Sequence, residues 1–253
     1  MNILEEIIAN KRKEIARIKE EHPQFEGALP EVPPFMAALE GDSMGLIAEV
    51  KRRSPSAGEI RVPFDPAEIA LAYEAHGASA ISCLMDRVYF GGGEEDFKQV
   101  RAAVELPMLY KEFVIDPWQV EHARRIGASA VLLIVAALEQ AELLELSAAV
   151  ESWGMQALVE VHDQVEMERA IACGATCIGV NNRNLKTFNT SLEVTYNLAK
   201  MCPEGTMLVS ESGIQTAADI EALQRAGVEA VLVGESLLRQ SDVGVAVKQL
   251  MQG

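Results

Sequence analysis

Four segments of similar sequence recur along the chain, and each joins a glycine to an apolar run. The segments are HGASAISCL, IGASAVLLI, CGATCIGV and AGVEAVLVG, and their glycines are Gly77, Gly127, Gly174 and Gly227. The glycines are spaced by 50, 47 and 53 residues, which is room for two β-strand–α-helix units per period. Because a glycine just after a helix commonly adopts left-handed backbone, each segment predicts a helix end followed by a buried strand.

From residue 46 onward, short apolar runs alternate with longer helical patterns. We predict strands at 46–51, 79–84, 107–111, 129–135, 156–161, 176–181, 206–210 and 229–234. We predict helices at 66–76, 94–104, 117–126, 139–152, 163–173, 191–201, 216–226 and 242–251. Strict alternation is typical of parallel strands joined by crossover helices. The eight units predict an α/β fold, a single (β/α)8 TIM barrel, and no Rossmann fingerprint follows a predicted strand to favour an open sheet.

The first 45 residues do not follow this alternation. Their apolar positions include Ile3, Leu4, Ile7, Ile8, Ile15 and Ile18. This spacing predicts an amphipathic helix over 3–21, with charged turns on its other face. Four prolines between residues 23 and 34 predict an extended connector, and a short helix at 35–39 precedes the first strand. We therefore divide the chain into an N-terminal helical extension, 1–45, packed on a barrel domain, 46–253.

The composition excludes several kinds of partner. The chain has 253 residues, a net charge of −16 and a pI of about 4.7. Nucleic acids and anionic membranes bind basic surfaces, so neither is expected as a partner. No apolar run is long enough to span a membrane, and the start of the sequence does not resemble a signal peptide. We expect a cytoplasmic protein whose four cysteines are reduced.

The stretch LIAEVKRRSPSAG, residues 46–58, combines a buried strand with charge. Glu49 and Lys51 are two positions apart, so they lie on one face of the strand at its carboxyl end. A polar loop follows them. Charged residues at this place, followed by a long loop, are typical of the sites of α/β barrels. The alternative is an edge strand whose charges are solvated.

Other predicted strands also end in polar residues. These residues are Lys111, Glu160, Asn181 with Arg183 shortly after it, and Glu211 with Ser212. Strand ends of one barrel converge on one mouth, where burial makes charges costly unless they act together. The set therefore predicts a catalytic site. None of the histidines, including His162 directly after the fifth strand, belongs to a cluster with metal-ligand spacing, so we expect no metal.

Two glycine-containing turns predict a phosphate site. VSESGI and VLVGES place Gly213 and Gly234 after the seventh and eighth strands, where barrels often bind phosphate. Ser54 in the first loop could add a hydroxyl group. Phe90 and Phe113 follow the second and third strands and suit an apolar wall for an aromatic substrate. The alternatives are plain tight turns for the glycines and core packing for the aromatic residues.

Several stretches together resemble indole-3-glycerol phosphate synthases. They are IAEVKRRSPSAG, YFGGG, KEFVIDPWQV, VLLIVAAL, ALVEVHD, IGVNNRNLKTF, VSESGI and VLVGESLLR, in the order of that family and over about residues 2–250. The resemblance implies a TIM barrel with an N-terminal helical extension. It also implies ring closure of 1-(2-carboxyphenylamino)-1-deoxyribulose 5-phosphate to indole-3-glycerol phosphate, carbon dioxide and water, in tryptophan biosynthesis and without a cofactor.

The resemblance also implies roles for single residues. Lys111 matches the general acid, Glu160 the general base, and Lys51 and Arg183 the groups that hold the ring carboxylate. The residues that match positions orienting the lysines and the substrate are Glu49, Asn181, Glu211 and Ser212. The residues that match the phosphate contacts are Ser54, Gly213, Gly234 and, through its backbone, Glu235. Glu112, Gly93 and Met85 depart from the family's usual Asp, Ser and Thr, which leaves open the reaction rate and the shape of the substrate pocket.

Two alternatives share parts of this pattern. Phosphoribosylanthranilate isomerase, another phosphosugar barrel, would share the phosphate contacts but would not require Lys51, Lys111 and Glu160 together. A barrel without activity that binds a phosphate ligand or a partner subunit would not require Lys111 and Glu160. We expect a small phosphosugar-anthranilate substrate and a monomer, and association with other tryptophan-pathway enzymes stays open.

Overall fold

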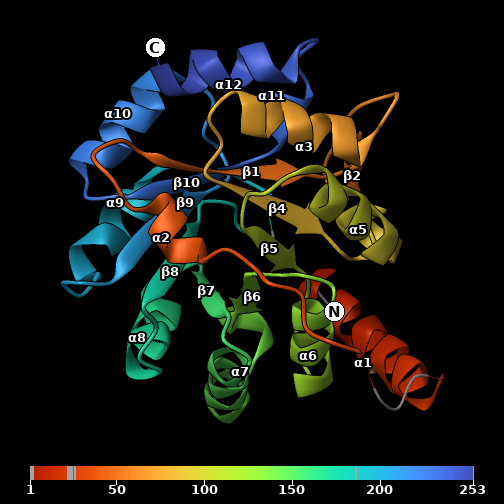
Figure 1. The fold of residues 1–253 in the computed structure, drawn as a ribbon. Helices are drawn as coiled ribbons and strands as arrows, with labels where there is room; N and C mark the ends of the chain where they lie inside the picture. Colours follow the sequence, from red (N-terminus) through yellow and green to blue (C-terminus); the bar gives the residue numbers. More distant parts are fainter. Residues whose placement is uncertain (1–2, 22–24, 26, 186, 253) are drawn as a thin grey trace.

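Eight parallel strands close into a barrel in the computed structural model, which describes residues 3–21, 25, 27–185 and 187–252 (Figure 1). The order around the ring is β1, β10, β9, β8, β7, β6, β5 and β4, with β4 paired to β1. The strands are β1 Gly45–Val50, β4 Ala80–Leu84, β5 Met108–Lys111, β6 Ala130–Ile134, β7 Gln156–Val161, β8 Cys177–Asn181, β9 Met207–Glu211 and β10 Ala230–Val233. Every strand begins and ends within one residue of its predicted limits, so the predicted barrel is confirmed.

Helices surround the barrel and connect its strands (Figure 1). They are α3 Pro66–Ala75, α5 Glu94–Ala103, α6 Pro117–Arg125, α7 Gln140–Ser152, α8 Gln164–Ala172, α9 Glu193–Leu198, α10 Ala217–Arg225 and α12 Val243–Gln252. The first turns of α3, α6 and α8 are capped by the side chains of Asp65, Asp116 and Asp163, which accept hydrogen bonds from backbone N–H groups that have no partner within the helix. The four repeat glycines have φ angles of 97°, 96°, 77° and 87°, which confirms the predicted left-handed helix ends.

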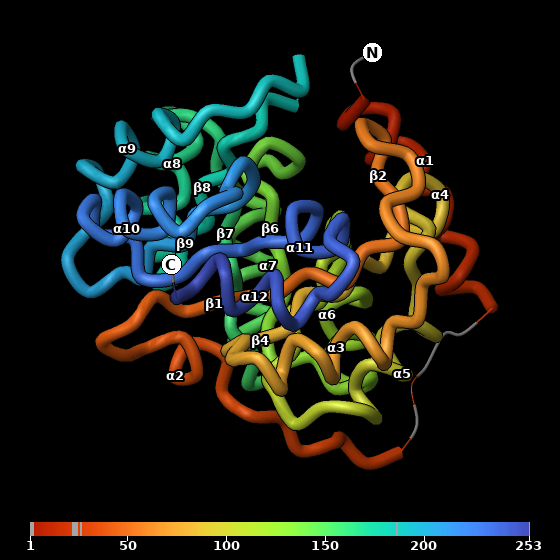
Figure 2. Tube along the Cα trace, turned by 90° about the horizontal axis from the view of Figure 1, so that it is seen from above, coloured from red at the N-terminus to blue at the C-terminus, as the bar shows by residue number. Residues whose placement is uncertain are grey.

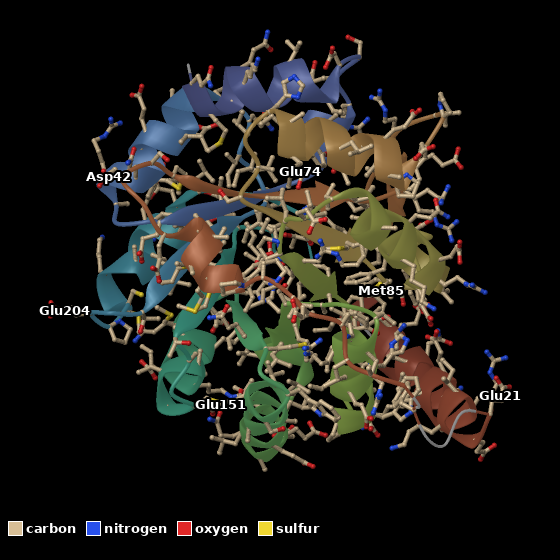
Figure 3. The ribbon with its side chains drawn as sticks, in the orientation of Figure 1. Glu21, Asp42, Glu74, Met85, Glu151 and Glu204 are labelled. Atoms are coloured by element: carbon tan, nitrogen blue, oxygen red, sulfur yellow. The ribbon has the colours of Figure 1, made fainter. Side chains whose placement is uncertain are left out.

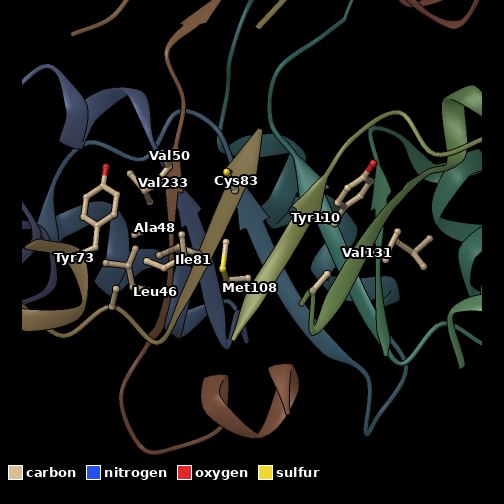
Figure 4. Close-up of a cluster of buried hydrophobic side chains, with 14 of the residues drawn as sticks. Leu46, Ala48, Val50, Tyr73, Ile81, Cys83, Met108, Tyr110, Val131 and Val233 are labelled. Atoms are coloured by element: carbon tan, nitrogen blue, oxygen red, sulfur yellow. The ribbon is translucent and has the colours of Figure 1, made fainter. Parts of the chain in front are cut away.

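Alternation along the strands divides the apolar residues between two cores. Leu46, Ala48 and Ile81 belong to the outer core, where strand side chains pack beneath the helices (Figure 4). Ile47 and Leu109 belong to the inner core, inside the barrel. Because both faces of each strand are buried, the strands read as continuous apolar runs.

The helix α2, Phe35–Leu39, closes the amino end of the barrel. Phe35 and Leu39 are almost fully buried and belong to the inner core, and the N–H group of Met36 donates to Oε1 of Gln156 at 2.8 Å. Figure 2 shows α2 at one end of the molecule, with α1, α4 and β2 at the other. The end opposite α2 is the one where the polar strand ends meet.

The helix α1, Ile3–Glu21, packs beside the open end of the barrel (Figure 2). Its buried residues are Ile7, Lys11 and Ile15. Burial of Lys11 corrects the prediction that the charged residues of this helix all lie on its outer face. Nζ of Lys11 lies 2.9 Å from Glu112, and this ion pair ties the helix to the barrel. The proposed division into residues 1–45 and 46–253 stays a prediction.

Several short elements were not predicted. They are the paired strands β2 Arg53–Ser54 and β3 Gly58–Glu59, the helices α4 Arg87–Phe90 and α11 Glu235–Leu238, and the 3-10 turns η1 Val135–Ala137 and η2 Ala199–Met201. Each has four residues or fewer, which is too short for a periodic apolar pattern. All but η2 follow the carboxyl end of a barrel strand. The unpredicted structure therefore lies mostly around the site.

Acidic side chains are spread over the outside of the molecule. The labelled Glu21, Asp42, Glu151 and Glu204 are exposed and lie at its periphery, whereas Met85 is buried (Figure 3). This distribution agrees with the net charge of −16. In the part of the chain that the structure describes, no helix is long and apolar enough to cross a membrane.

Candidate active site

A cavity of about 630 Å³ lies at the carboxyl ends of the barrel strands. Its lining includes all fourteen residues that the sequence predicts for the site. They are Glu49, Lys51, Ser54, Phe90, Lys111, Phe113, Glu160, Asn181, Arg183, Glu211, Ser212, Gly213, Gly234 and Glu235. Residues from most of the barrel strands therefore meet in one place, as the strand-end argument predicts.

Lys111 lies at the centre of this group, on the last residue of β5. Its Nζ donates a short hydrogen bond to Oε2 of Glu211 and lies 3.6 Å from Oε2 of Glu160. Burial alone would lower the pKa of Lys111, but Glu211, Glu160 and Glu49 outweigh burial and raise it above its ordinary value. The ammonium group is therefore charged at neutral pH and can act as a proton donor.

Glu160 faces Lys111 from the end of β7. Its side chain is 4% exposed, and its Oε1 lies 3.3 Å from Nε2 of His162. Burial would raise the pKa of Glu160, but the charge of Lys111 and the groups of His162 and Asn181 bring it below its ordinary value. The carboxylate is therefore ionised at neutral pH and can accept a proton.

Glu211 pairs with Lys111, as Glu160 does, but its other neighbours differ. Burial raises the pKa of its carboxyl group, the nearby charge of Glu160 adds to this, and Lys111 offsets only part of it. Its Oε1 is buried without a hydrogen-bond partner among the described residues. Gly179 on β8 leaves room for this oxygen, because a Cβ atom there would collide with it.

Glu49 and Lys51 form a second buried pair at the end of β1. Nζ of Lys51 donates to Oε1 of Glu49, which confirms that the two side chains lie on one face. Burial would raise the pKa of Glu49, but the charges of Lys51 and Lys111 lower it. Gly234 makes space for the pair, since a Cβ atom there would lie 2.6 Å from Oε1 of Glu49.

Arg183 connects three loops around the mouth. Its Nη1 donates to Oγ of Ser56 at 2.8 Å, and its Nη2 lies 3.7 Å from Oε2 of Glu235. Its backbone N–H donates to Oδ1 of Asn181 at 3.0 Å. The Arg183 side chain is 27% exposed and lines the cavity, so it can still bind an anionic group there.

The turn after β9 has unusual backbone. Ser212 has a φ of 66° and Gly213 one of 82°, so two consecutive residues are left-handed. This region is uncommon for serine and is often found at functional sites. Nδ2 of the buried Asn182 donates to the carbonyl oxygens of Glu211 and Ser212 at 3.0 Å each and holds the turn. Asn182 is not among the residues that the sequence predicts for the site.

Apolar residues also line the cavity. The rings of Phe90 and Phe113 lie 6.1 Å apart, centre to centre. Ile3, Leu4 and Ile7 of α1 also line the cavity. The amphipathic pattern of α1 predicts that its apolar face, which includes Ile3 and Ile7, packs on the barrel and helps to cover the mouth of the site.

Glu112, one of the departures from the family pattern, lines the cavity and belongs to a buried ionic cluster. Nζ of Lys11 lies within 3.0 Å of carboxylate oxygens of Glu112, Asp86 and Glu14. Burial raises the pKa of Glu112 to about 7, and Asp86 adds to this while Lys11 opposes it. The cluster fixes α1 next to Phe113, whose N–H donates to Oε1 of Glu112 at 2.7 Å.

The other two departures do not disturb the polar site. The N–H of Met85 donates to the carbonyl oxygen of Lys111 at 3.0 Å, a backbone contact that any residue could make. Gly93 caps the start of α5 without a side chain. No group of three or more His, Cys, Asp or Glu side chains that could hold a metal ion lies within the ranges 3–21, 25, 27–185 and 187–252.

Comparison with known proteins identifies close matches over the whole chain. The family model for indole-3-glycerol phosphate synthase matches residues 4–250. The enzyme of that name from Polaromonas sp. strain JS666 is 44% identical over 264 residues, covering 98% of each chain. The one from Rhizorhabdus wittichii is 45% identical over 261 residues, covering 100% of this chain and 99% of the relative.

Solved structures with low sequence identity support the fold alone. The N-acetylmannosamine-6-phosphate 2-epimerase from Clostridium perfringens is 15% identical and has a TM-score of 0.64, covering 83% of this chain and 93% of its own. A mandelate oxidase variant is 16% identical and has a TM-score of 0.59, covering 83% and 71%.

Proposed function

The chain belongs to the indole-3-glycerol phosphate synthase family, a lyase of tryptophan biosynthesis, and from this we propose how its residues divide the reaction between them. The substrate is 1-(2-carboxyphenylamino)-1-deoxyribulose 5-phosphate. Its aromatic ring closes on the sugar carbonyl, and carbon dioxide and water are lost. The reaction thus needs an acid for the carbonyl oxygen, a group for the ring carboxylate and a base for the dehydration.

Lys111 is the general acid of ring closure. The ring carbon that carries the carboxylate attacks the carbonyl carbon, and the carbonyl oxygen takes a proton from Nζ. Carbon dioxide then leaves, and its bonding electron pair restores the aromatic ring. A charged ammonium group on a rigid strand end suits this step, because the proton donor must be in place as the new bond forms.

Glu160 is the general base of the dehydration. It takes a proton from the carbon next to the ring nitrogen. Lys51, the second acid, gives a proton to the hydroxyl group, which leaves as water. The lowered pKa of Glu160 keeps it ionised for this step. The residues that orient the lysines and the substrate are Glu49, Asn181, Glu211 and Ser212.

The remaining residues bind the two ends of the substrate. Lys51 and Arg183 hold the ring carboxylate until it leaves, and Phe90 and Phe113 form the wall beside the aromatic ring. The phosphate contacts are the Ser54 hydroxyl and the backbone N–H groups of Gly213, Gly234 and Glu235. These assignments follow the family pattern, and the placement of all these residues around one cavity supports them.

The observation that carries the proposal is the 3.6 Å separation of Lys111 Nζ and Glu160 Oε2, which puts an acid and a base within reach of one substrate. The test is incubation of the purified protein with the carboxyphenylamino substrate while the indole fluorescence of the product is followed. We expect turnover by the wild-type protein and its loss in Lys111→Met and Glu160→Gln. Full activity of either variant would contradict its assigned role. We also propose that the enzyme is cytoplasmic and monomeric. Sedimentation analysis of the purified protein can check that it is a monomer.

A further inference from the structure

His162 stands directly behind the proposed base and is not part of the cavity lining. It follows β7, two positions after Glu160, and so it lies on the same face of the chain. Its Nε2 is 3.3 Å from Oε1 of Glu160, an ion-pair distance, and makes no hydrogen bond among the described residues. This is the Glu160 oxygen that does not face Lys111, so the two oxygens of the carboxylate have different cationic neighbours.

A second carboxylate fixes the imidazole from the other side. Oε2 of Glu166, in the first turn of α8, lies 2.9 Å from Nδ1 of His162 and accepts the backbone N–H of His162 at 2.8 Å. When Nδ1–H donates to Glu166, a neutral imidazole would turn a bare Nε2 lone pair toward the Glu160 carboxylate. Only the doubly protonated ring has a favourable contact on both sides.

Exposure falls along this row of side chains toward the cavity. The side chains of Glu166, His162 and Glu160 are 16%, 12% and 4% exposed. An isolated carboxylate as buried as Glu160 would tend to become neutral. Its neighbours are Lys111 from β5, Asn181 from β8, Glu211 from β9 and His162.

We propose that His162 and Glu166 are positioning residues for the general base: the imidazolium, held by Glu166, keeps Glu160 ionised and directs its other oxygen into the cavity. The inference rests on the proposed role of Glu160. It adds two residues that do not touch the substrate to the machinery of the reaction. The pKa of His162, which burial would lower, is raised to about 10 by Glu160 and Glu166, in agreement with a charged ring.

The chain offers a matched pair of substitutions. In His162→Asn, the amide nitrogen takes the place of Nδ1, so the link to Glu166 and α8 is kept while the contact with Glu160 is lost. In His162→Gln, the amide nitrogen takes the place of Nε2, so a neutral donor still reaches Glu160. The readout is the dependence of kcat on pH, with circular dichroism confirming the fold at each pH.

We expect the acid limb of the profile in His162→Asn to move upward by about one to three pH units, because an adjacent opposite charge lowers a carboxyl pKa by that much. In His162→Gln the limb should move less, and KM should change little in both variants. A displacement below about one unit in His162→Asn would overturn the proposal.

A control separates this role from support of the helix. Asp163 caps α8 by accepting the N–H of Glu166 at 2.9 Å and has no contact with Glu160 among the described residues. Asp163→Ala should lower the melting temperature and leave the acid limb in place. A limb that moves equally in Asp163→Ala would show that His162 acts only through the fold. Turnover by wild type and its loss in Glu160→Gln test the base itself, so the two proposals can fail separately.

Discussion

Replacement of Lys111 with methionine should stop proton donation while keeping the shape of the pocket. Methionine has a similar length and an apolar stem, but it has no proton to give. A positioned general acid contributes about two to four orders of magnitude to a rate. We therefore expect kcat to fall about 10²- to 10⁴-fold, with much smaller changes in the binding of the product, indole-3-glycerol phosphate.

The same substitution should destabilise the fold, because Lys111 offsets buried carboxylates. Glu160 and Glu211 are 4% and 2% exposed, and Glu211 would lose its closest cation. Removal of one partner from a buried ion pair typically costs about 3–5 kcal/mol. At roughly 2–4 °C per kcal/mol, the melting temperature should fall by about 6–20 °C. Uptake of a proton by Glu211, whose pKa is already raised, should keep the loss near the lower figure.

The assay must therefore separate chemistry from stability. Steady-state kinetics and product titrations should be run well below the melting temperature of each variant. Lys51→Met is the matched control. Lys51 likewise pairs with a buried carboxylate, that of Glu49, but its assigned role is to hold the ring carboxylate of the substrate. In that variant, KM should rise as kcat falls. If Lys111→Met keeps more than about a tenth of wild-type kcat, it lies outside the general-acid range, and Lys51 becomes the acid.

Four further predictions test other parts of the site. Lys11→Met should raise KM and lower the melting temperature, because the Lys11 side chain is 1% exposed and its ion pairs are buried. Lys19→Met should change either value little, because the Lys19 side chain is 44% exposed. Gly234→Ala should lower kcat as well as raise KM, since its Cβ would push Glu49 away from Lys51; unchanged kcat would contradict the predicted collision. The pKa of Glu112 is raised from 4.5 to about 7 in the folded state, so its protonated form stabilises the fold. This stabilisation is complete below pH 4.5 and is lost as the pH rises through about 7. In thermal melts, Glu112→Gln should therefore gain stability relative to wild type between those pH values, and a constant difference would exclude the shift. Exhaustive chelation with EDTA should leave kcat unchanged, because the proposed acids and base are side chains; a loss restored by a divalent metal would refute this.

The fold was predictable because its main signals are local. Each strand has both faces buried, so it appears as an apolar run, and each repeat glycine marks a helix end. The short helices α4 and α11 and the strands β2 and β3 carry no such signal. They are held by contacts between distant segments, such as the bonds from Nη2 of Arg53 to the carbonyl oxygens of Arg87 and Val88. Patterns within a segment cannot reveal contacts of this kind.

The site was predictable wherever it depends on strand ends, and less so elsewhere. Lys11 is buried although it belongs to a charged stretch of an amphipathic helix, because its partners Asp86 and Glu112 come from other parts of the chain. His162 had a local signal, since it lies two positions after Glu160. Its position directly after the strand favours a contact with the start of the next helix over one with the site, and the structure gives the imidazole both.

The carboxyl groups around the cavity show what the sequence leaves undetermined even where the residues it names lie together. Glu49, Glu160 and Glu211 are chemically identical and occupy equivalent strand ends. Burial would raise the pKa of all three, and the balance of neighbours decides the outcome. Glu160 has a cation near each oxygen and stays ionised, which its proposed role as the base requires. Glu211 shares one cation with Glu160 and has its pKa raised, because burial and the charge of Glu160 outweigh Lys111. The division of labour among equal side chains is thus set by distances across the barrel.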